Sequence, residues 1–325
     1  MSPRLLTALS DGAIAVPDTG RIAVIRPTTA HDLDALPRDR VQVIQGYKPN
    51  HDAFAQAGYD VTVSADGRFA ATLICVPRSK AQTRGLIAQA AAQTDGPIWI
   101  DGQKNDGIES ILRDIKKRGT VGPVVSKAHG KLFGVSGGDF SDWSIKPGQV
   151  EGFRTVPGVF SADGIDPASR MLAQALPPKL PGRMADLGAG WGYLSRAALT
   201  REGLKELHLV EAEHLALDCA RANIDDERAT FHWADARLFQ PDRGLDGVLM
   251  NPPFHQGRSA DPSLGKAFIA AAARVLAPHG KLWMVANRHL PYETVAADVF
   301  QNVAEIGGDK RFKILAAEKP RRQRR

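Results

Sequence analysis

Residues Ala185 to Ser195 read ADLGAGWGYLS, and this stretch decides the fold. The residues that lead into it, Arg183 to Leu187, are typical of a short buried strand, and a helix is predicted from about Tyr193. The loop between them contains three glycines at alternate positions, Gly188, Gly190 and Gly192. Glycine accepts positive φ angles and lets the backbone approach a ligand closely. The stretch therefore predicts a strand, a glycine loop and a helix that together can hold a nucleoside.

Strands and helices alternate along the sequence that follows this loop. Strands are predicted at four further places: Glu206–Glu211, Thr230–Trp233, Gly247–Met250 and Lys281–Ala286. Helices are predicted at Leu215–Asn223 and Ser263–Leu276. Such alternation is typical of a mostly parallel sheet with helices on both faces, and ligands bind such sheets beyond the carboxyl ends of the strands. The polar residues that follow these strands are therefore the candidate site.

The first half of the chain has a similar rhythm with weaker signals. Strand-like segments are RIAVI, VQVIQGY, FAATLICVP, GPIWIDG and VGPVVSKAHGKLFGV, with helices predicted around Lys80–Ala92 and Gly107–Lys117. Its one candidate cofactor turn, IWIDGQKNDG, has only Gly102 and Gly107, a spacing too open to hold a cofactor. We therefore expect two α/β domains, residues 1–147 and 148–318, followed by a basic tail, residues 319–325.

Acidic residues indicate which nucleoside the second domain binds. Tyr193 stands where the dinucleotide fingerprint would have its third glycine. Glu211 ends the second strand 19 residues after Gly192, where a carboxylate can accept both hydroxyls of a ribose. Asp235 can accept from an adenine amine or cap the next helix, and Asp186 can bind a ligand or its own loop amides. Together these acids favour S-adenosylmethionine over a nicotinamide cofactor.

A stiff corner follows the fourth strand, where Leu249 to Gly257 read LMNPPFHQG. Pro252 and Pro253 have no N–H and restrict the backbone, so the corner offers acceptors without competing donors. The side-chain oxygen of Asn251 and the carbonyl of Pro252 can accept from the two N–H bonds of a planar amine, and Phe254 can stack on its ring. These acceptors stabilise the charge that grows on such a nitrogen as it takes a methyl group, by positioning and electrostatics and without a strong base.

The composition limits the partners and the compartment. Lysine and arginine outnumber aspartate and glutamate by 42 to 36, a net charge of +6, with basic clusters at Lys310–Lys313 and Lys319–Arg325. This excess favours a nucleic-acid partner, and a solvated tail is the alternative. Cys75 and Cys219 lie far apart and form no CxxC pair, so we expect neither a disulfide framework nor a metal site. No signal peptide or apolar run of about 18 residues is evident, so we expect a cytoplasmic protein without a membrane partner, and a monomer.

The chain resembles the bacterial ribosomal RNA guanine-N2 methyltransferases of the RsmC and RlmG type. The segments that carry the likeness are TVPGVFSADGIDPASRML, ADLGAGWGYLS, LMNPPFHQG, VANRHLPYE and IGGDKRFKIL, and more loosely VPRSKAQ and IWIDGQKNDGIESIL in the first half. Two departures are Ala189 and Trp191 in the glycine loop, where relatives often have a cysteine or smaller residues, and the ending has an extra basic pair.

This resemblance implies two tandem Rossmann-like methyltransferase domains with mostly parallel sheets covered by helices. The N-terminal copy would be degenerate and would support RNA recognition or folding, while the C-terminal copy would bind S-adenosylmethionine and carry out the transfer. The family's target corner maps onto Asn251, Pro252, Pro253 and Phe254. Its cofactor residues map onto Asp186, Gly188, Gly190, Gly192, Glu211 and Asp235, with Asn251 next to both ligands.

The expected function is transfer of a methyl group to the exocyclic N2 of a guanine in ribosomal RNA or an assembled subunit, with 16S RNA preferred. NPP followed by an aromatic residue also occurs in adenine-N6 and glutamine-N5 methyltransferases, so another exocyclic amine or amide is an alternative. Further alternatives are a non-catalytic RNA-binding assembly factor on the same scaffold and, third, a nicotinamide oxidoreductase.

Overall fold

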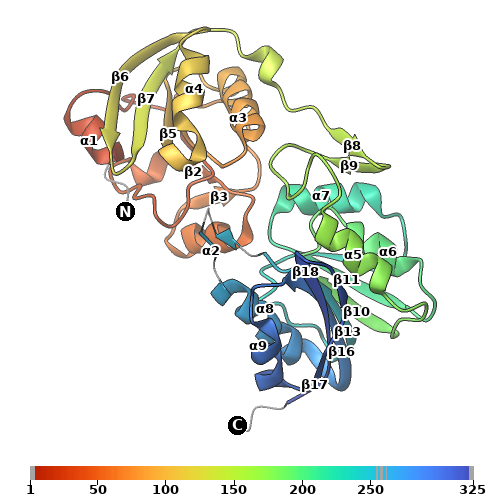
Figure 1. The fold of residues 1–325 in the computed structure, drawn as a ribbon. Coiled ribbons are helices and arrows are strands. Elements are labelled where there is room, and N and C mark those ends of the chain that lie inside the picture. Colours follow the sequence, from red (N-terminus) through yellow and green to blue (C-terminus); the bar gives the residue numbers. More distant parts are fainter. Residues whose placement is uncertain (1–3, 254, 257–258, 261, 322–325) are drawn as a thin grey trace. The chain divides into compact units, whose positions relative to one another are not determined.

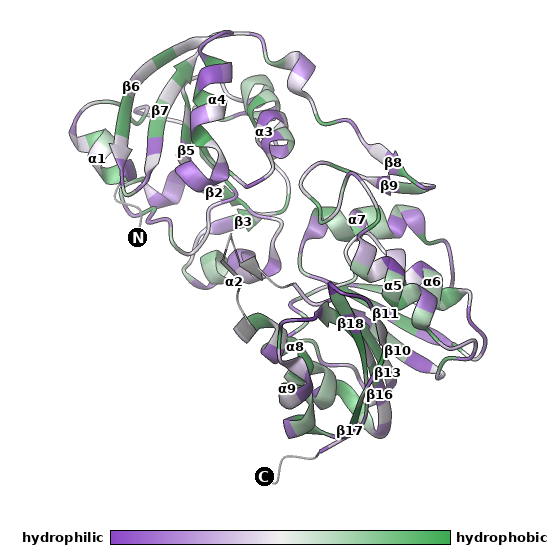
Figure 2. Ribbon diagram, viewed as in Figure 1, coloured by the Kyte–Doolittle hydropathy of each residue, from purple (hydrophilic) through white to green (hydrophobic). Residues whose placement is uncertain are grey.

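The computed structural model describes residues 4–253, 255–256, 259–260 and 262–321. The chain divides into two compact units, Met1–Pro147 and Gly148–Arg325. Figure 1 shows that each unit is a twisted sheet with helices packed against it. Figure 2 shows hydrophobic residues along the central strands, while the helices mix hydrophobic and hydrophilic residues, as expected for helices with one buried face.

The first unit contains a seven-stranded sheet. Five neighbouring strands are parallel, and the last two form an antiparallel hairpin at one edge. In sheet order the strands are β3 (Asp60–Thr62), β2 (Val41–Ile44), β1 (Ile22–Ile25), β4 (Ala71–Cys75), β5 (Ile98–Gln103), β7 (Gly130–Ser136) and β6 (Thr120–Lys127). The helices are α1 (Arg4–Ser10), α2 (Lys48–Gln56), α3 (Lys80–Gln93) and α4 (Ile108–Ile115), with short 3-10 turns at Arg38–Arg40, Lys104–Asp106 and Ser141–Trp143.

Two apolar clusters lie on the two faces of this sheet. Side chains from α3 and α4 form one cluster with the strands, and side chains from α1 and α2 contribute to the other. The segment VGPVVSKAHGKLFGV differs from its prediction because it forms both β6 and β7. Ala128 and His129 join these strands with φ angles of 49° and 56°, a left-handed turn that the apolar pattern does not reveal.

The second unit also contains a seven-stranded sheet, and its strands follow one another across the sheet in the same order as in the first unit. In sheet order the strands are β12 (Ala229–Trp233), β11 (Glu206–Glu211), β10 (Arg183–Leu187), β13 (Leu245–Met250), β16 (Leu276–Asn287), β18 (Phe312–Pro320) and β17 (Phe300–Gly308). The helices are α5 (Pro167–Ala175), α6 (Tyr193–Leu199), α7 (His214–Asn223), α8 (Pro262–Val275) and α9 (Tyr292–Val299). Two small hairpins pair β8 (Gly148–Val150) with β9 (Phe153–Thr155) and β14 (His255–Gln256) with β15 (Ser259–Ala260).

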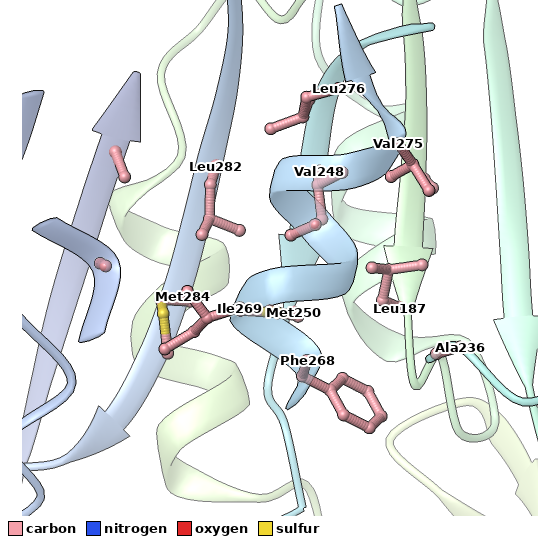
Figure 3. Close-up of a cluster of buried hydrophobic side chains, with 14 of the residues drawn as sticks. Leu187, Ala236, Val248, Met250, Phe268, Ile269, Val275, Leu276, Leu282 and Met284 are labelled. Atoms are coloured by element: carbon pink, nitrogen blue, oxygen red, sulfur yellow. The ribbon is translucent and has the colours of Figure 1, made fainter. Parts of the chain in front are cut away.

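Alternate residues of each strand face opposite sides of this sheet, as the two-residue period of a strand requires. Leu187 and Met250 face α8 and pack with Phe268 and Ile269, and Figure 3 shows these side chains around the helix. Met184 and Leu249 belong to the opposite cluster, which includes side chains from α5, α6 and α7. Both faces of the central strands are therefore covered, which explains their continuous apolar sequences.

The predicted fold class is confirmed, and β10 and β11 have the predicted bounds. Helix α5 was not predicted, and β16 begins at Leu276 instead of Lys281. Lys319 and Pro320, which we expected in the basic tail, belong at the end of β18, and Arg322–Arg325 lie outside the described residues. Within the part of the chain that the structure describes, none of the helices is long and apolar enough to cross a membrane.

Candidate active site

The candidate site lies at the point of the second sheet where the strand order reverses: from β10 the chain adds β11 and β12 on one side and then β13 on the other. Strand β10 lies between β11 on one side and β13 on the other, and the three strands are parallel. Asp186 pairs in register with Leu249, and Glu211 with Trp233. The glycine loop, Glu211, Asp235 and Asn251 therefore follow neighbouring strands at one carboxyl edge. This edge of the sheet, at its topological switch point, is where open α/β sheets bind ligands.

All three glycines of the loop have positive φ angles, but their surroundings differ. A Cβ at Gly190 would meet no atom within 4 Å, and one at Gly188 would be 3.5 Å from the Phe268 ring. A Cβ at Gly192 would be 2.9 Å from Ile224 and 3.4 Å from Ala220. Gly190 is therefore the glycine beside open space, whereas Gly192 allows α6 to approach the C-terminal part of α7.

Glu211 holds the glycine loop in place. Its carboxylate accepts from the backbone N–H of Gly190 at 2.8 Å and from that of Glu213 at 2.8 Å. Burial raises the pKa of the Glu211 carboxyl, and the two backbone hydrogen bonds act against that rise. Each carboxylate oxygen can accept a second hydrogen bond, so the side chain can hold the loop and still accept from ribose hydroxyls.

Asp186 lies fully buried below the loop. One of its oxygens accepts from the Ser195 hydroxyl at 2.7 Å, and the other, Oδ1, has no hydrogen-bond partner among the described residues. Burial raises the pKa of Asp186 to about 7; the Ser195 hydrogen bond opposes the rise, and the charge of Glu211 adds to it. A buried acceptor that lacks a donor suits a cationic or hydrogen-bonding ligand at this loop. With the open space at Gly190, it fits the S-adenosylmethionine predicted from the sequence.

Asp235 follows β12 and closes its own turn. Its carboxylate accepts from the backbone N–H of Arg237 at 2.9 Å, and the Arg237 guanidinium binds both carboxylate oxygens at 2.5 to 3.0 Å. The alternative prediction, that Asp235 caps a following helix, is wrong, because a turn and not a helix follows this residue before β13. A contact with adenine would use the lone pairs that Arg237 leaves over.

The side-chain amide of Asn251 is fixed by two residues, Asp166 and Ser169, for which no such role was predicted. Its nitrogen Nδ2 donates to Asp166 Oδ2 at 2.9 Å and to Ser169 Oγ at 2.8 Å. Both N–H bonds of the amide are therefore in use, and Oδ1 is its remaining polar atom. Pro252 is buried and Pro253 is exposed, while Phe254 lies outside the described residues.

The sequence contains a signal for the start of α5, but none for the contact of this helix with Asn251. Asp166 is the N-cap of α5 and accepts from the Ser169 backbone N–H at 2.8 Å, and Pro167 occupies the first turn. An aspartate followed by proline before an apolar run predicts a helix start. The contact with Asn251 joins residues 82 and 85 positions apart, and no local pattern reports such a distance.

The basic cluster Lys310–Lys313 does not act as one surface. Lys313 is buried and its ammonium pairs with Glu293 at 2.6 Å, so this lysine is not part of the basic surface for a nucleic acid that the cluster had suggested. The strand alternation of β18 turns Lys313 towards α9. Lys310 and Arg311 precede the strand and are exposed.

A protein-family model described as "Methyltransferase small domain" matches residues 151–316. A ribosomal RNA small subunit methyltransferase C of Alteromonas mediterranea is 26% identical, with 98% of this chain and 99% of the relative covered. A ribosomal RNA large subunit methyltransferase G of Ectopseudomonas mendocina is 36% identical over 50% of this chain and 44% of the relative. A solved structure described as the Thermus thermophilus 16S rRNA N2 G1207 methyltransferase with AdoMet and guanosine has a TM-score of 0.76 at 23% identity, covering 94% and 90% of the two chains.

The fold, the site and the family model define an S-adenosylmethionine-dependent methyltransferase. The chain belongs to the methyltransferase small domain family, whose model covers the unit that carries the glycine loop and the Asn251 corner. The resemblance, the enzyme class and the cofactor predicted from the sequence are thereby confirmed.

Proposed function

We propose that this methyltransferase transfers a methyl group from S-adenosylmethionine to the exocyclic N2 amine of a guanine in small-subunit ribosomal RNA. The observation that carries the proposal is the orientation of Asn251. Its amide nitrogen is occupied by Asp166 and Ser169, so an acceptor, Oδ1, is left for a substrate amine. A relative that aligns with 98% of this chain is named as a small-subunit ribosomal RNA methyltransferase, and one solved structure of the same fold is described with guanosine.

The chemistry explains why such an acceptor is needed. The lone pair of an exocyclic amine is delocalised into the base, so the amine is a poor nucleophile. In this proposal Asn251 Oδ1 and the carbonyl of Pro252 accept from its two N–H bonds, which favours a pyramidal nitrogen and stabilises its growing positive charge. The bound cofactor supplies an electrophilic methyl group on its sulfonium. No strong base is required, because the nitrogen loses a proton readily once it is alkylated.

The cofactor residues in this proposal have distinct tasks. Glu211 accepts from the ribose while it holds the loop, and Gly190 lets the backbone approach the ligand. Asp186 offers its unpaired oxygen below the loop, and Asp235 accepts from the adenine amine. Gly188 gives the loop its turn, with a φ of 81°. Gly192 serves the packing of α6 against α7 instead of the ligand, on account of its contact with Ile224.

The RNA is held through phosphates outside the pocket. Exposed Lys310 and Arg311 are the described basic residues of the cluster that can reach phosphate. The target guanine leaves its stack to reach Asn251, at a cost of a few kcal/mol. Residues 1–147 form the degenerate domain that supports RNA recognition or folding, and residues 148–318 form the catalytic domain. The protein acts as a cytoplasmic monomer.

The test uses labelled S-adenosylmethionine and ribosomal RNA from cells that lack this protein. Free 16S RNA and isolated small subunits are incubated with the purified enzyme, and the RNA is digested to nucleosides. We expect the label in N2-methylguanosine. Label in N6-methyladenosine would show that adenine is the substrate, and cofactor binding without transfer to either RNA would favour an assembly factor.

A further inference from the structure

We propose that Asp166 and Ser169 are positioning residues that fix the side-chain amide of Asn251 with its oxygen towards the target amine. The inference deepens the proposed function and rests on the role of Asn251 in it. It concerns two residues at the start of α5, the helix that precedes the glycine loop in the sequence. Within the described part of the corner, both residues accept from Asn251.

The two ends of a carboxamide have nearly the same shape, so packing cannot distinguish them. Hydrogen bonds decide the orientation, because one end only donates and the other only accepts. Asp166 Oδ2 lies 2.9 Å from Asn251 Nδ2, and a carboxylate can accept but not donate. If the Asn251 amide were turned by 180°, its oxygen would face that carboxylate oxygen. The Asp166 carboxylate therefore excludes the orientation in which Asn251 presents N–H bonds to the substrate.

Ser169 supplies the second acceptor. Its hydroxyl oxygen is 2.8 Å from Asn251 Nδ2, and the residue is buried, with 8% of its surface exposed. With both N–H bonds of the amide directed to Asp166 and Ser169, the amide plane is fixed as well as its orientation. The substrate amine then meets an acceptor whose direction is set before binding, which lowers the reorganisation needed in the transition state.

The helix start keeps these two acceptors rigid. Asp166 Oδ2 also accepts from the Ser169 backbone N–H at 2.8 Å, which closes the first turn of α5. Leu172 and Ala173 bury this helix against the sheet. A helix cap needs only the bond from the Ser169 N–H. The bonds to Asn251 are additional to it, and they extend the cap into the corner that follows β13.

The donor and the acceptor of the hydrogen bond between Asn251 and Asp166 can be exchanged by a pair of substitutions. Asp166 Oδ2 is both the capping oxygen and the acceptor for Asn251. In Asp166→Asn, which retains the size of the side chain, an NH2 group at the position of Oδ2 can bind the oxygen of Asn251 and turn its nitrogen outwards, with loss of the cap. Asn251→Asp has an oxygen at both ends, but beside Asp166 it brings two carboxylates together. In the double variant the introduced amide faces the introduced carboxylate, and an oxygen again faces the substrate.

The experiment measures kcat, KM for RNA, cofactor Kd and Tm for the wild type, both single variants and the double variant. We expect each single variant to lose about 100-fold in kcat, as for other preorganised hydrogen bonds at reacting groups, with a cofactor Kd close to that of the wild type. The double variant should recover at least about tenfold over either single variant. Ser169→Ala, which keeps the backbone cap, should lose about tenfold in kcat. Asp163→Asn, an exposed acid of the same segment, is the matched control and should behave as the wild type.

Wild-type kcat in Ser169→Ala, or a double variant whose losses simply multiply, would overturn the positioning role. A helix-capping role alone predicts a lower Tm without rescue by the second substitution. If Asp166→Asn does not fold, Ser169→Ala still decides, since unchanged kcat in that variant contradicts the inference. Failure of the proposed function is separate, because the wild type would then form no N2-methylguanosine.

Discussion

The backbone N–H of Gly190 donates to the carboxylate of Glu211 at 2.8 Å, so one acid both shapes the glycine loop and borders the space beside it. The loop on β10 and the acid that ends β11 are thereby one unit. In the proposed function this carboxylate also accepts from the cofactor ribose, so we expect substitutions of Glu211 to affect cofactor binding more than the stability of the domain.

Glu211→Gln should weaken S-adenosylmethionine binding by about 10- to 100-fold. The substitution replaces one acceptor with an NH2 group that faces the N–H of Gly190 or Glu213, and a hydrogen bond to a charged group contributes about 1.5–3 kcal/mol. Titration calorimetry measures the change, with the exposed Glu227→Gln as the control. An unchanged Kd would remove Glu211 from the cofactor site.

Asp186 should make the ligand-free protein less stable as the pH rises. Its folded pKa of about 7 lies above the ordinary value of 3.8, so between these values the folded state binds more protons than the unfolded state. Its contribution to the free energy of unfolding therefore falls as the pH rises from about 4 to 7, by about 4 kcal/mol at most, and is constant above that range. Urea unfolding of the wild type and Asp186→Asn at pH 5, 6, 7 and 8 isolates this contribution. Parallel curves for the two proteins would refute it.

Gly190→Ala should mainly weaken cofactor binding, whereas Gly192→Ala should mainly lower the stability of the domain. Gly192→Ala places a Cβ 2.9 Å from Ile224 at a φ of 91°, so we expect a loss of about 1–3 kcal/mol of stability. Gly190→Ala meets no atom within 4 Å, so only the left-handed backbone costs stability, about 1 kcal/mol, while the methyl group enters the ligand space. Urea unfolding and cofactor titration distinguish the two variants. The reverse ranking, with Gly190→Ala the less stable protein and the tighter binder, is the result that these contacts do not allow.

The basic residues near β18 should fall into two classes. Lys310→Ala with Arg311→Ala should lower RNA affinity and reduce the salt dependence of binding by up to about two counterions, since each phosphate contact releases about one. Lys313→Gln should instead lower the unfolding temperature and leave RNA affinity unchanged, because its ammonium is buried against Glu293. Filter binding at several salt concentrations, together with thermal unfolding, checks both statements. Equal effects of the two changes on RNA binding would contradict this division.

The centre of the second sheet could be predicted because β10, β11 and β13 are apolar on both faces and end at distinct signals, whereas β17 and β18 were not predicted. Glycines follow β10, an acid ends β11, and prolines follow β13. The turn of β6 into β7 was missed, since Ala128 and His129 are not typical turn residues although both have positive φ angles. Helix α5 was missed because its capping residue, Asp166, lies in a segment that we interpreted only as a family signature.

The site could be predicted in outline but not in its contacts. The sequence places Asn251 at the end of a strand, and only the folded chain brings it to Asp166 and Ser169, 85 and 82 residues away. The burial of Lys313 could not be predicted for the same reason, because its partner, Glu293, is distant in the sequence. A run of basic residues suggests a charged surface, but β18 is buried on both faces around Lys313, which points towards α9 and is neutralised there by Glu293.

Asn251→Ala tests the central claim most directly, by the rate of methyl transfer to guanine N2 in a single turnover at saturating cofactor. We predict a rate more than about 100-fold below that of the wild type, with a cofactor Kd within about threefold, whereas exposed Asn302→Ala should have the wild-type rate. Transfer by Asn251→Ala at the wild-type rate would contradict the account, because the amine would then need no acceptor at this corner.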